Sequence, residues 1–293
     1  MAVQKTNKLV APVVKWVGGK RQLLPEIKKY SPKKFNTYFE PFVGGGAVLF
    51  ELQPKQAVIN DINKELINLY SVIQNNVEEL IGKLSDTNVY SNTSECYYRI
   101  RELDREPKKY NKLTGIDRAA RILYLNKTCY NGLYRVNSMG EFNSPFGSYK
   151  NPNIVNEITL RAVHKYFNES NIKFLNVDFE KTVKNAKRDD FVYFDPPYAP
   201  ISKTSNFTGY NESGFGENEQ IRLKELCDTL NKKGVKFLLS NSDCEFIREL
   251  YKDYNIVTIK AKRAINSNGN NRGAVSEAVS YTHLRAHETP EHL

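Results

Sequence analysis

Short apolar segments alternate along this chain with segments whose apolar residues recur at helical spacing. Near the N-terminus, residues 38–43 form an apolar run that ends at three glycines, and residues 47–52 begin a helical pattern. Residues 57–59 form a second apolar run, and another helical pattern starts at Ile62. Repeated alternation of strand and helix predicts an α/β fold with a mostly parallel sheet.

The pattern changes between residues 76 and 165, where apolar residues recur at helical spacing and tyrosines and basic residues are frequent. Within this region, residues 130–142 contain two β-type runs around Asn137-Ser138-Met139-Gly140, a composition typical of a hairpin turn. We therefore predict a mainly helical insertion that carries one β-hairpin.

Strand and helix patterns return after residue 165. Apolar runs at 172–177, 189–194 and 236–240 predict three further strands, and residues 199–219 predict a long polar loop. We therefore expect one α/β domain made of residues 1–75 and 166–280, with residues 76–165 inserted into it. Residues 281–293 differ in composition from the rest, and we interpret them as an atypical tail of foreign or frameshifted origin.

Composition excludes several classes of protein. Of the 293 residues, 40% are hydrophobic, which is typical of a folded chain with its own core. No apolar run approaches the ~20 residues of a membrane span, and the N-terminus lacks a secretory signal pattern. Four widely spaced cysteines without a CxxC pattern indicate reduced thiols. We expect a cytoplasmic protein.

Positive charge is concentrated in two parts of the chain. The net charge is +10, and residues 1–40 and 99–165 each carry an excess of seven basic over acidic residues. Such segments are typical of surfaces that meet a polyanion, and a solvated basic surface is an equally good interpretation of charge alone.

The strongest chemical signal is the segment Phe191-Val192-Tyr193-Phe194-Asp195-Pro196-Pro197-Tyr198. It places a carboxylate, two rigid prolines and an aromatic ring at the carboxyl end of a strand, where open α/β sheets bind ligands. The carboxylate and the backbone carbonyls offer acceptors for a planar amine, and the tyrosine offers a face for stacking. A proline-stiffened strand end is the structural alternative.

A glycine turn and two other segments add to this signal. Gly44-Gly45-Gly46 joins a strand to a helix, and Leu49 in place of the third glycine of GxGxxG disfavours an NAD site. Asp61 follows the next strand, where its carboxylate is placed to bond a ribose diol. The segment from Pro12 to Lys20 holds the single tryptophan, Trp16.

Together, in this order, these motifs resemble the adenine-specific DNA methyltransferases of the Dam type (D12 class), from about Pro12 to Glu277. The resemblance implies a class I S-adenosylmethionine-dependent methyltransferase fold with an inserted DNA-recognition domain at 76–165. It implies S-adenosyl-L-methionine as cofactor and double-stranded DNA as partner. The implied catalytic residues are Asp195, Pro196, Pro197 and Tyr198. The implied cofactor-binding residues are Trp16, Lys20, Phe42, Gly44, Gly46, Asp61, Asp178, Phe179 and Asp195.

The resemblance also assigns residues to DNA. In relatives that methylate GATC the hairpin enters the major groove, which makes Arg135 the expected reader of guanine. Asn131, Leu133 and Pro145 belong to the same recognition motif, and Lys15 is expected near the DNA. Basic residues of the insertion, which do not read sequence, are expected to contact phosphates: Arg118, Arg121 and Lys127.

The implied reaction is methyl transfer to adenine N6 in GATC, with the base rotated out of the duplex and stacked on Tyr198. Asp195 and the Pro196 carbonyl would accept the N6 hydrogens. We expect no metal, because His164 is isolated and His283 and His287 lack a third ligand. We expect a monomer, and a cognate restriction endonuclease is a further partner to consider. Two other interpretations are an RNA or protein amide substrate and a non-catalytic DNA-binding module.

Overall fold

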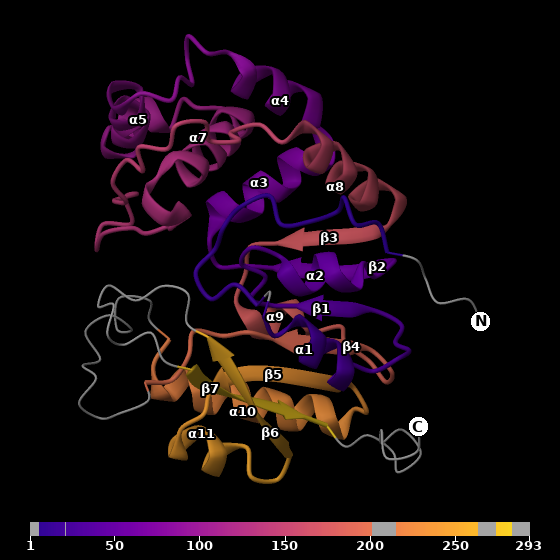
Figure 1. The fold of residues 1–293 in the computed structure, drawn as a ribbon. Helices are drawn as coiled ribbons and strands as arrows, with labels where there is room; N and C mark the ends of the chain where they lie inside the picture. Colours follow the sequence, from indigo (N-terminus) through magenta and orange to yellow (C-terminus); the bar gives the residue numbers. More distant parts are fainter. Residues whose placement is uncertain (1–5, 21, 201–214, 263–273, 283–293) are drawn as a thin grey trace. The chain divides into compact units, whose positions relative to one another are not determined.

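The computed structural model describes residues 6–20, 22–200, 215–262 and 274–282 (Figure 1). By its contacts the chain forms two compact units. Unit 1 comprises residues 1–19, 43–55 and 60–176, and unit 2 comprises residues 20–42, 56–59 and 177–293.

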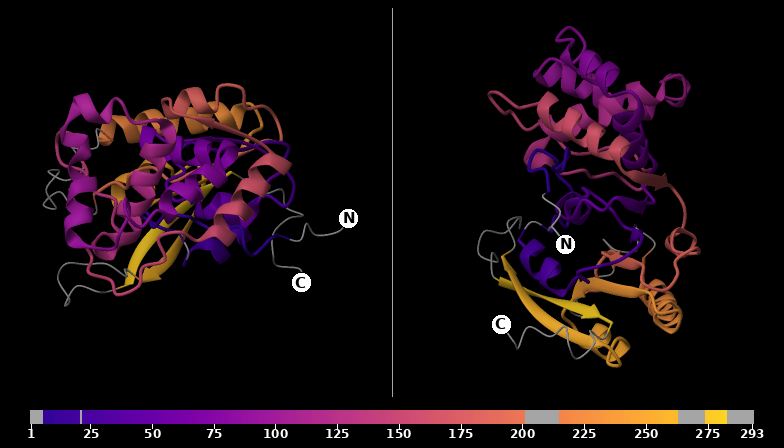
Figure 2. Two further views of the ribbon diagram at one scale, coloured as in Figure 1. Left: turned by 90° about the horizontal axis from the view of Figure 1, so that it is seen from above. Right: turned by 90° about the vertical axis from the view of Figure 1, so that its right-hand side faces the viewer.

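Unit 2 contains a mostly parallel sheet. Its strands are β1 (Tyr38–Glu40), β2 (Gln56–Asn60, the last residue counted with unit 1), β4 (Phe191–Phe194), β5 (Lys236–Ser242), β6 (Asn255–Lys262) and β7 (Ala274–Tyr281). Their order is β2-β1-β4-β5-β7-β6. Neighbours from β2 to β5 run parallel, with Phe191 of β4 opposite Lys236 of β5. β7 runs antiparallel to both of its neighbours, β5 and β6. The two strands β6 and β7 form a long pair (Figure 2).

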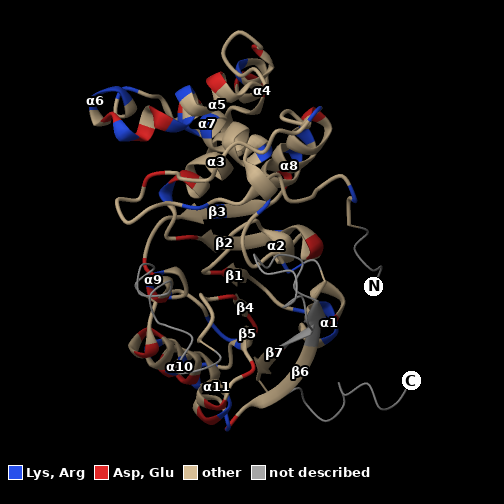
Figure 3. Cartoon of the chain, turned by 60° about the vertical axis from the view of Figure 1, so that its left-hand side comes forward, with Lys and Arg blue, Asp and Glu red and all other residues tan. Residues whose placement is uncertain are grey.

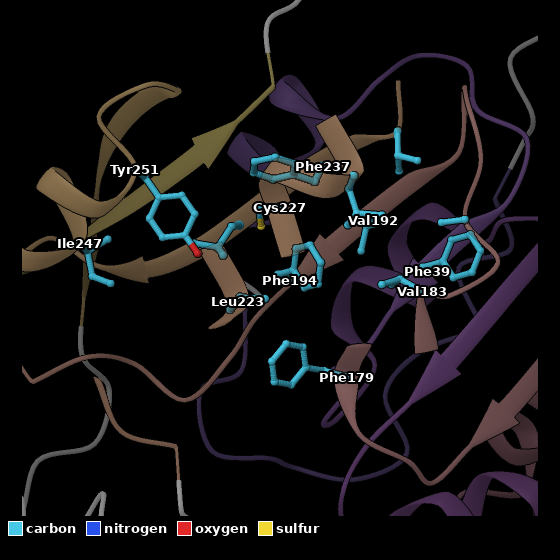
Figure 4. Close-up of a cluster of buried hydrophobic side chains, with 14 of the residues drawn as sticks. Phe39, Phe179, Val183, Val192, Phe194, Leu223, Cys227, Phe237, Ile247 and Tyr251 are labelled. Carbon is cyan, nitrogen blue, oxygen red and sulfur yellow. The ribbon is translucent and has the colours of Figure 1, made fainter. Parts of the chain in front are cut away.

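The core of unit 2 is formed where helices cover this sheet. The helices are α1 (Leu24–Tyr30), α9 (Phe179–Thr182), α10 (Glu217–Lys232) and α11 (Glu245–Leu250). Leu223, Cys227 and Leu230 recur at helical spacing on α10, and all three are buried. They belong to the same cluster as Phe194 and Phe237 of the sheet (Figure 4). One face of α10 therefore closes the core over β4 and β5.

Unit 1 is mainly helical. Its elements are α2 (Ala47–Leu52), α3 (Lys64–Asn75), α4 (Val77–Ser85), α5 (Ser94–Arg101), the 3-10 turn η1 (Glu102–Arg105), α6 (Pro107–Tyr110), α7 (Gly115–Thr128), the 3-10 turn η2 (Tyr130–Gly132), α8 (Glu157–Glu169) and strand β3 (Asn171–Leu175). Tyr70 of α3 packs with Phe50, Phe167 and Phe174 at ring-centroid distances of 5.7–6.3 Å. The Thr114 hydroxyl and the Asp117 carboxylate form a capping box that starts α7.

The predicted α/β class with a mostly parallel sheet is confirmed. The helix predicted from Ile62 begins at Lys64 because the Asn63 side chain caps it, accepting from two backbone N–H groups. The predicted hairpin is present in reduced form, with isolated bridges between Val136 and Phe142 and, at its base, between Cys129 and Phe146.

Some of the predicted segments lie partly or wholly outside the residues that the structure describes. Most of the polar loop and most of the tail lie outside the described residues, as do residues 263–273. Tyr281, however, pairs with Leu238 in the sheet, so the first residue of the predicted tail is part of β7. The domain boundaries at 76 and 166 stay a prediction.

The packing of α10 predicts a large difference between two neighbouring side chains. Leu223→Ala removes a fully buried side chain from the core and should cost about 2–5 kcal/mol of unfolding free energy. Ile221→Ala on the same helix removes a side chain that is 39% exposed and should cost much less. Urea unfolding of both variants measures this, and equal losses would contradict the assigned face of α10.

Candidate active site and recognition hairpin

Asp195, in unit 2, follows directly after β4, whose four residues are all buried. The Lys20 Nζ lies 2.9 Å from its Oδ1, and the two side chains are 6% and 19% exposed. Burial raises the pKa of Asp195 to about 6, and the Lys20 cation counteracts part of that rise. The carboxylate is therefore an ionised acceptor at neutral pH, held beside a buried cation.

Tyr198 is held at two points. Its hydroxyl donates to Glu277 Oε2 on β7 at 2.7 Å, and Lys20 Nζ lies 4.8 Å from its ring centroid. Burial raises the pKa of Tyr198 well above its ordinary value, so the hydroxyl stays neutral. Glu277 was not predicted as a site residue. Its signal in the sequence is a carboxylate between Val275 and Val279, in the apolar register of a strand.

A buried polar network fixes the backbone that follows Asp195. Gln220 Nε2 donates to the Pro197 carbonyl at 2.8 Å, and Asn241 Nδ2 donates to Gln220 Oε1 at 3.0 Å. Asn241 Oδ1 in turn accepts from the Ala199 N–H at 3.0 Å. Gln220 and Asn241 are at most 2% exposed, and neither was predicted. The only sequence signal is the polar run that ends the apolar strand β5.

Three predicted cofactor residues of unit 2 lie close together. The rings of Phe42 and Phe179 are 5.5 Å apart. The Arg222 guanidinium lies 4.2 Å from the Phe179 ring centroid and forms an ion pair with Asp178. Asp178 also caps α9 by accepting from the Glu180 N–H at 3.0 Å. The structure thus places Phe179 between the Phe42 ring and the Arg222 guanidinium, and Arg222 connects Phe179 to the Asp178 carboxylate.

The glycine loop, in unit 1, is tied to Asp61. The Gly44 N–H donates to Asp61 Oδ2 at 2.9 Å, and the Asn63 N–H donates to Oδ1 at the same distance. The Tyr70 hydroxyl donates to the Gly44 carbonyl at 2.8 Å. Gly44 and Gly46 have φ of 48° and 72°, a conformation that favours glycine. Burial raises the pKa of Asp61, opposed by these backbone hydrogen bonds.

Trp16 lies between this loop and the recognition motif of unit 1. A Cβ at Gly44 would lie 2.9 Å from Trp16 Cδ1, and Trp16 stacks on Tyr134 with ring centroids 4.6 Å apart. The adjacent Lys15 is fixed through its backbone, because the Asn126 side chain accepts from its N–H and donates to its carbonyl.

The hairpin holds Arg135 in a defined orientation. Arg135 Nε donates to Asn143 Oδ1 at 2.7 Å, and the Asn143 N–H donates to the Arg135 carbonyl at 2.9 Å. Leu133 accepts from the Ser144 hydroxyl, and the Pro145 carbonyl accepts from the Tyr130 N–H. Asn131 is exposed at the base of the hairpin, and Lys127 is half-buried on α7.

Two of the arginines predicted to contact phosphates are engaged inside unit 1. Arg118 forms an ion pair with Glu65. Arg121 is only 5% exposed and forms an ion pair with Asp104 at 2.7 Å. A buried guanidinium cannot reach a phosphate, so the structure favours a structural role for Arg121 over the predicted DNA contact.

Comparison with known proteins places the chain in a family. Residues 16–265 match the family described as D12 class N6 adenine-specific DNA methyltransferase. The chain belongs to this family and is therefore an adenine-specific DNA methyltransferase, with an α/β fold consistent with class I. The resemblance inferred from the sequence is confirmed.

Individual relatives match over nearly the whole chain. The Type II methyltransferase M1.LlaDCHI of Lactococcus lactis subsp. cremoris is 47% identical over 277 residues, which cover 94% of this chain and 97% of the relative. The Type II methyltransferase M.MjaIII of Methanocaldococcus jannaschii is 44% identical, with coverage of 90% and 95%. The DNA adenine methylase of Escherichia coli (strain K12) is 36% identical, with coverage of 91% and 93%.

Two features are absent from the described residues. No helix in the described part of the chain is long and apolar enough to cross a membrane. Across the same residues, no group of three or more His, Cys, Asp or Glu side chains is arranged to hold a metal ion.

The contact between Trp16 and the glycine loop predicts a spectroscopic effect. Gly44→Ala should move the Trp16 side chain, because the new Cβ would lie 2.9 Å from it and the backbone φ is positive. Trp16 is the single tryptophan, so its fluorescence reports this movement directly. Gly82→Ala is the control, because a Cβ at this helical position meets nothing within 4 Å. An unchanged emission spectrum in Gly44→Ala would contradict the contact.

Proposed function

We propose that the protein methylates N6 of adenine in the sequence GATC of double-stranded DNA, with S-adenosyl-L-methionine as methyl donor and with the target base rotated out of the duplex. The observation that carries this proposal is the cluster of Lys20, Asp195 and Tyr198 at the carboxyl end of β4. It combines a buried ionised acceptor with an aromatic face, as an exocyclic amine on a planar base requires.

The side chains present fit the proposed cofactor in chemical type. Asp61 uses each carboxylate oxygen once within the protein, which leaves acceptor capacity for ribose hydroxyls. We assign it this role, and we assign Asp178 and Phe179 to the adenine end. Trp16, Lys20, Phe42, Gly44, Gly46 and Asp195 complete the proposed cofactor-binding residues. S-adenosylmethionine supplies a methyl group made electrophilic by its sulfonium.

The chemistry of the target amine sets the task of the protein. Adenine N6 is a poor nucleophile because its lone pair is delocalised into the ring. Hydrogen bonds from N6 to the Asp195 carboxylate and to the Pro196 carbonyl localise that lone pair. The Pro197 carbonyl already accepts from Gln220, which helps to fix the backbone in place. As the N6–methyl bond forms and the sulfonium–methyl bond breaks, N6 loses one proton, which Asp195 accepts and passes to solvent. Positioning and electrostatics supply the catalysis.

The proposed DNA contacts divide into two kinds. Arg135 reads guanine with its guanidinium, supported on the hairpin by Asn131, Leu133 and Pro145. Lys15 and Lys127 lie near the phosphate backbone of the DNA and do not read its sequence. The proposal includes a monomeric, cytoplasmic enzyme, and a cognate restriction endonuclease is consistent with the Type II names of two relatives.

Transfer of tritium from labelled S-adenosylmethionine tests the proposed reaction and target. Label should enter a duplex with one GATC site and not a GTTC duplex, and Asp195→Ala should abolish transfer because it removes the acceptor. Asp253→Ala, at an exposed aspartate, is the matched control and should keep activity. Equal labelling of both duplexes would contradict the target, and full activity of Asp195→Ala would contradict the role of the carboxylate.

The pKa of Asp195 predicts an acid limb in the pH profile. Because the ionised form is the acceptor, kcat/KM should fall as pH drops through about 6. Lys20→Met removes the cation that opposes the effect of burial, so the midpoint should move to higher pH. Lys20→Arg keeps a cation and should restore a midpoint near that of the wild type. An identical midpoint in all three proteins would show that this carboxylate does not govern the limb.

A further inference from the structure

Arg121 is placed where a buried cation stabilises the end of a helix. Its Nε donates to the Ile100 carbonyl at 3.0 Å, and its Nη2 donates to the Arg101 carbonyl at 2.7 Å. These are the last two residues of α5, where carbonyls lack partners within the helix. A cation at a helix C-terminus is also favourable to the helix dipole. Arg121 therefore fixes the point at which α5 continues into η1.

Asp104, on η1, links this arginine to the hairpin. Its Oδ2 lies 2.7 Å from Arg121 Nη2 and also accepts from the Phe142 N–H at 2.8 Å. The neighbouring Arg105 donates from Nη2 to the Phe142 carbonyl at 2.9 Å. Both backbone polar groups of Phe142 are thus bonded to side chains of η1. The Asp104 side chain is 10% exposed, so the ion pair with Arg121 is shielded from water.

Phe142 belongs to the part of the hairpin that orients Arg135. It lies opposite Val136 in an isolated bridge, and its side chain, 2% exposed, packs edge-on against Tyr134 at 5.5 Å. The next residue, Asn143, makes the two hydrogen bonds to Arg135 described above. A continuous chain of contacts therefore runs from the buried Arg121 through Asp104 and Phe142 to Arg135.

We propose that Arg121 and Asp104 are positioning residues that set sequence discrimination by holding the Phe142 side of the hairpin in place beneath Arg135. This inference rests on the proposed function, in which the hairpin reads DNA. In the described residues 129–146, the hairpin segment has only two isolated bridges, Cys129 with Phe146 and Val136 with Phe142, and no continuous strand pair. A short two-stranded hairpin is marginally stable by itself, so its reading geometry depends on anchors outside it. The buried ion pair supplies such an anchor. Figure 3 shows that basic and acidic residues follow one another along α5, α6 and α7. Arg121 lies on α7, and Asp104 lies on η1 between α5 and α6.

The test compares how strictly four proteins choose their target. Wild type, Arg121→Gln, Asp104→Asn and Arg161→Gln are each used to methylate DNA of random sequence, and methyladenine is mapped by sequencing. The measured quantity is the ratio of methylation at the preferred sequence to methylation at its one-base variants. This ratio should fall about tenfold in Arg121→Gln and Asp104→Asn, which is no more than the discrimination between bases that one guanine-reading arginine provides. Arg161→Gln breaks an exposed ion pair with Glu78 on α4 and should keep the wild-type ratio.

Two further readouts separate positioning from a direct DNA contact. The slope of log affinity against log salt concentration should be the same in Arg121→Gln and wild type. Loss of a phosphate contact would instead make this negative slope less steep by about one. Hydrogen exchange at the Phe142 amide should accelerate in Asp104→Asn. If Arg121→Gln does not fold, the methylation ratio and the hydrogen exchange of Asp104→Asn still test the inference.

The outcomes distinguish this inference from the proposed target. If wild type prefers a sequence other than GATC, the proposed target is wrong, and the comparison of ratios still tests the anchor. An unchanged ratio in folded Arg121→Gln and Asp104→Asn overturns the anchor. So does a reduced salt slope with equal loss of binding to every sequence, because that result assigns Arg121 to phosphates.

Discussion

The ion pair between Lys20 and Asp195 is the constraint on which the proposed catalytic site of unit 2 depends. A carboxylate taken out of water loses its hydration, and burial raises the pKa of Asp195 to about 6 even though the Lys20 cation at 2.9 Å opposes that rise. Lys20 therefore keeps the acceptor ionised at neutral pH. The same ammonium group lies over the ring of Tyr198, so one cation organises both the acceptor and the stacking face.

A site of this kind also needs a backbone that does not relax. The two prolines restrict φ, but they remove N–H donors and leave carbonyls that must be satisfied from elsewhere. Gln220 of α10 donates to the Pro197 carbonyl, and Asn241 of β5 donates to Gln220 and accepts from the Ala199 N–H. Both elements belong to the core of unit 2. Stability of the core and geometry of the site are thus linked through two buried amides, each satisfied at both ends.

The sequence predicted the parts of this arrangement that are local. Apolar runs that end at Asp61 and Asp195 identify strand ends, because a strand and the residue after it are adjacent in the chain. Glu277 lies 79 residues from its partner Tyr198, and Asn241 lies 42 from Ala199. Hydrophobic periodicity carries no information on which polar side chains meet across such separations. The hairpin was placed correctly, but the side chains that bond the Phe142 backbone, Asp104 and Arg105, are connected to it by no local pattern.

Charge shows the same limit more sharply. The excess of basic residues in 99–165 suggested a surface for a polyanion, yet Arg118 and Arg121 within it are paired with carboxylates of unit 1. An arginine that is 5% exposed contributes nothing to the electrostatic attraction of DNA at long range, because its charge is neutralised by Asp104. In the proposed recognition it can still affect which sequence is chosen, because Arg135 would read bases only if it is held at a fixed place. A basic side chain can therefore serve recognition from inside the fold, and burial rather than charge decides which of the two roles it has.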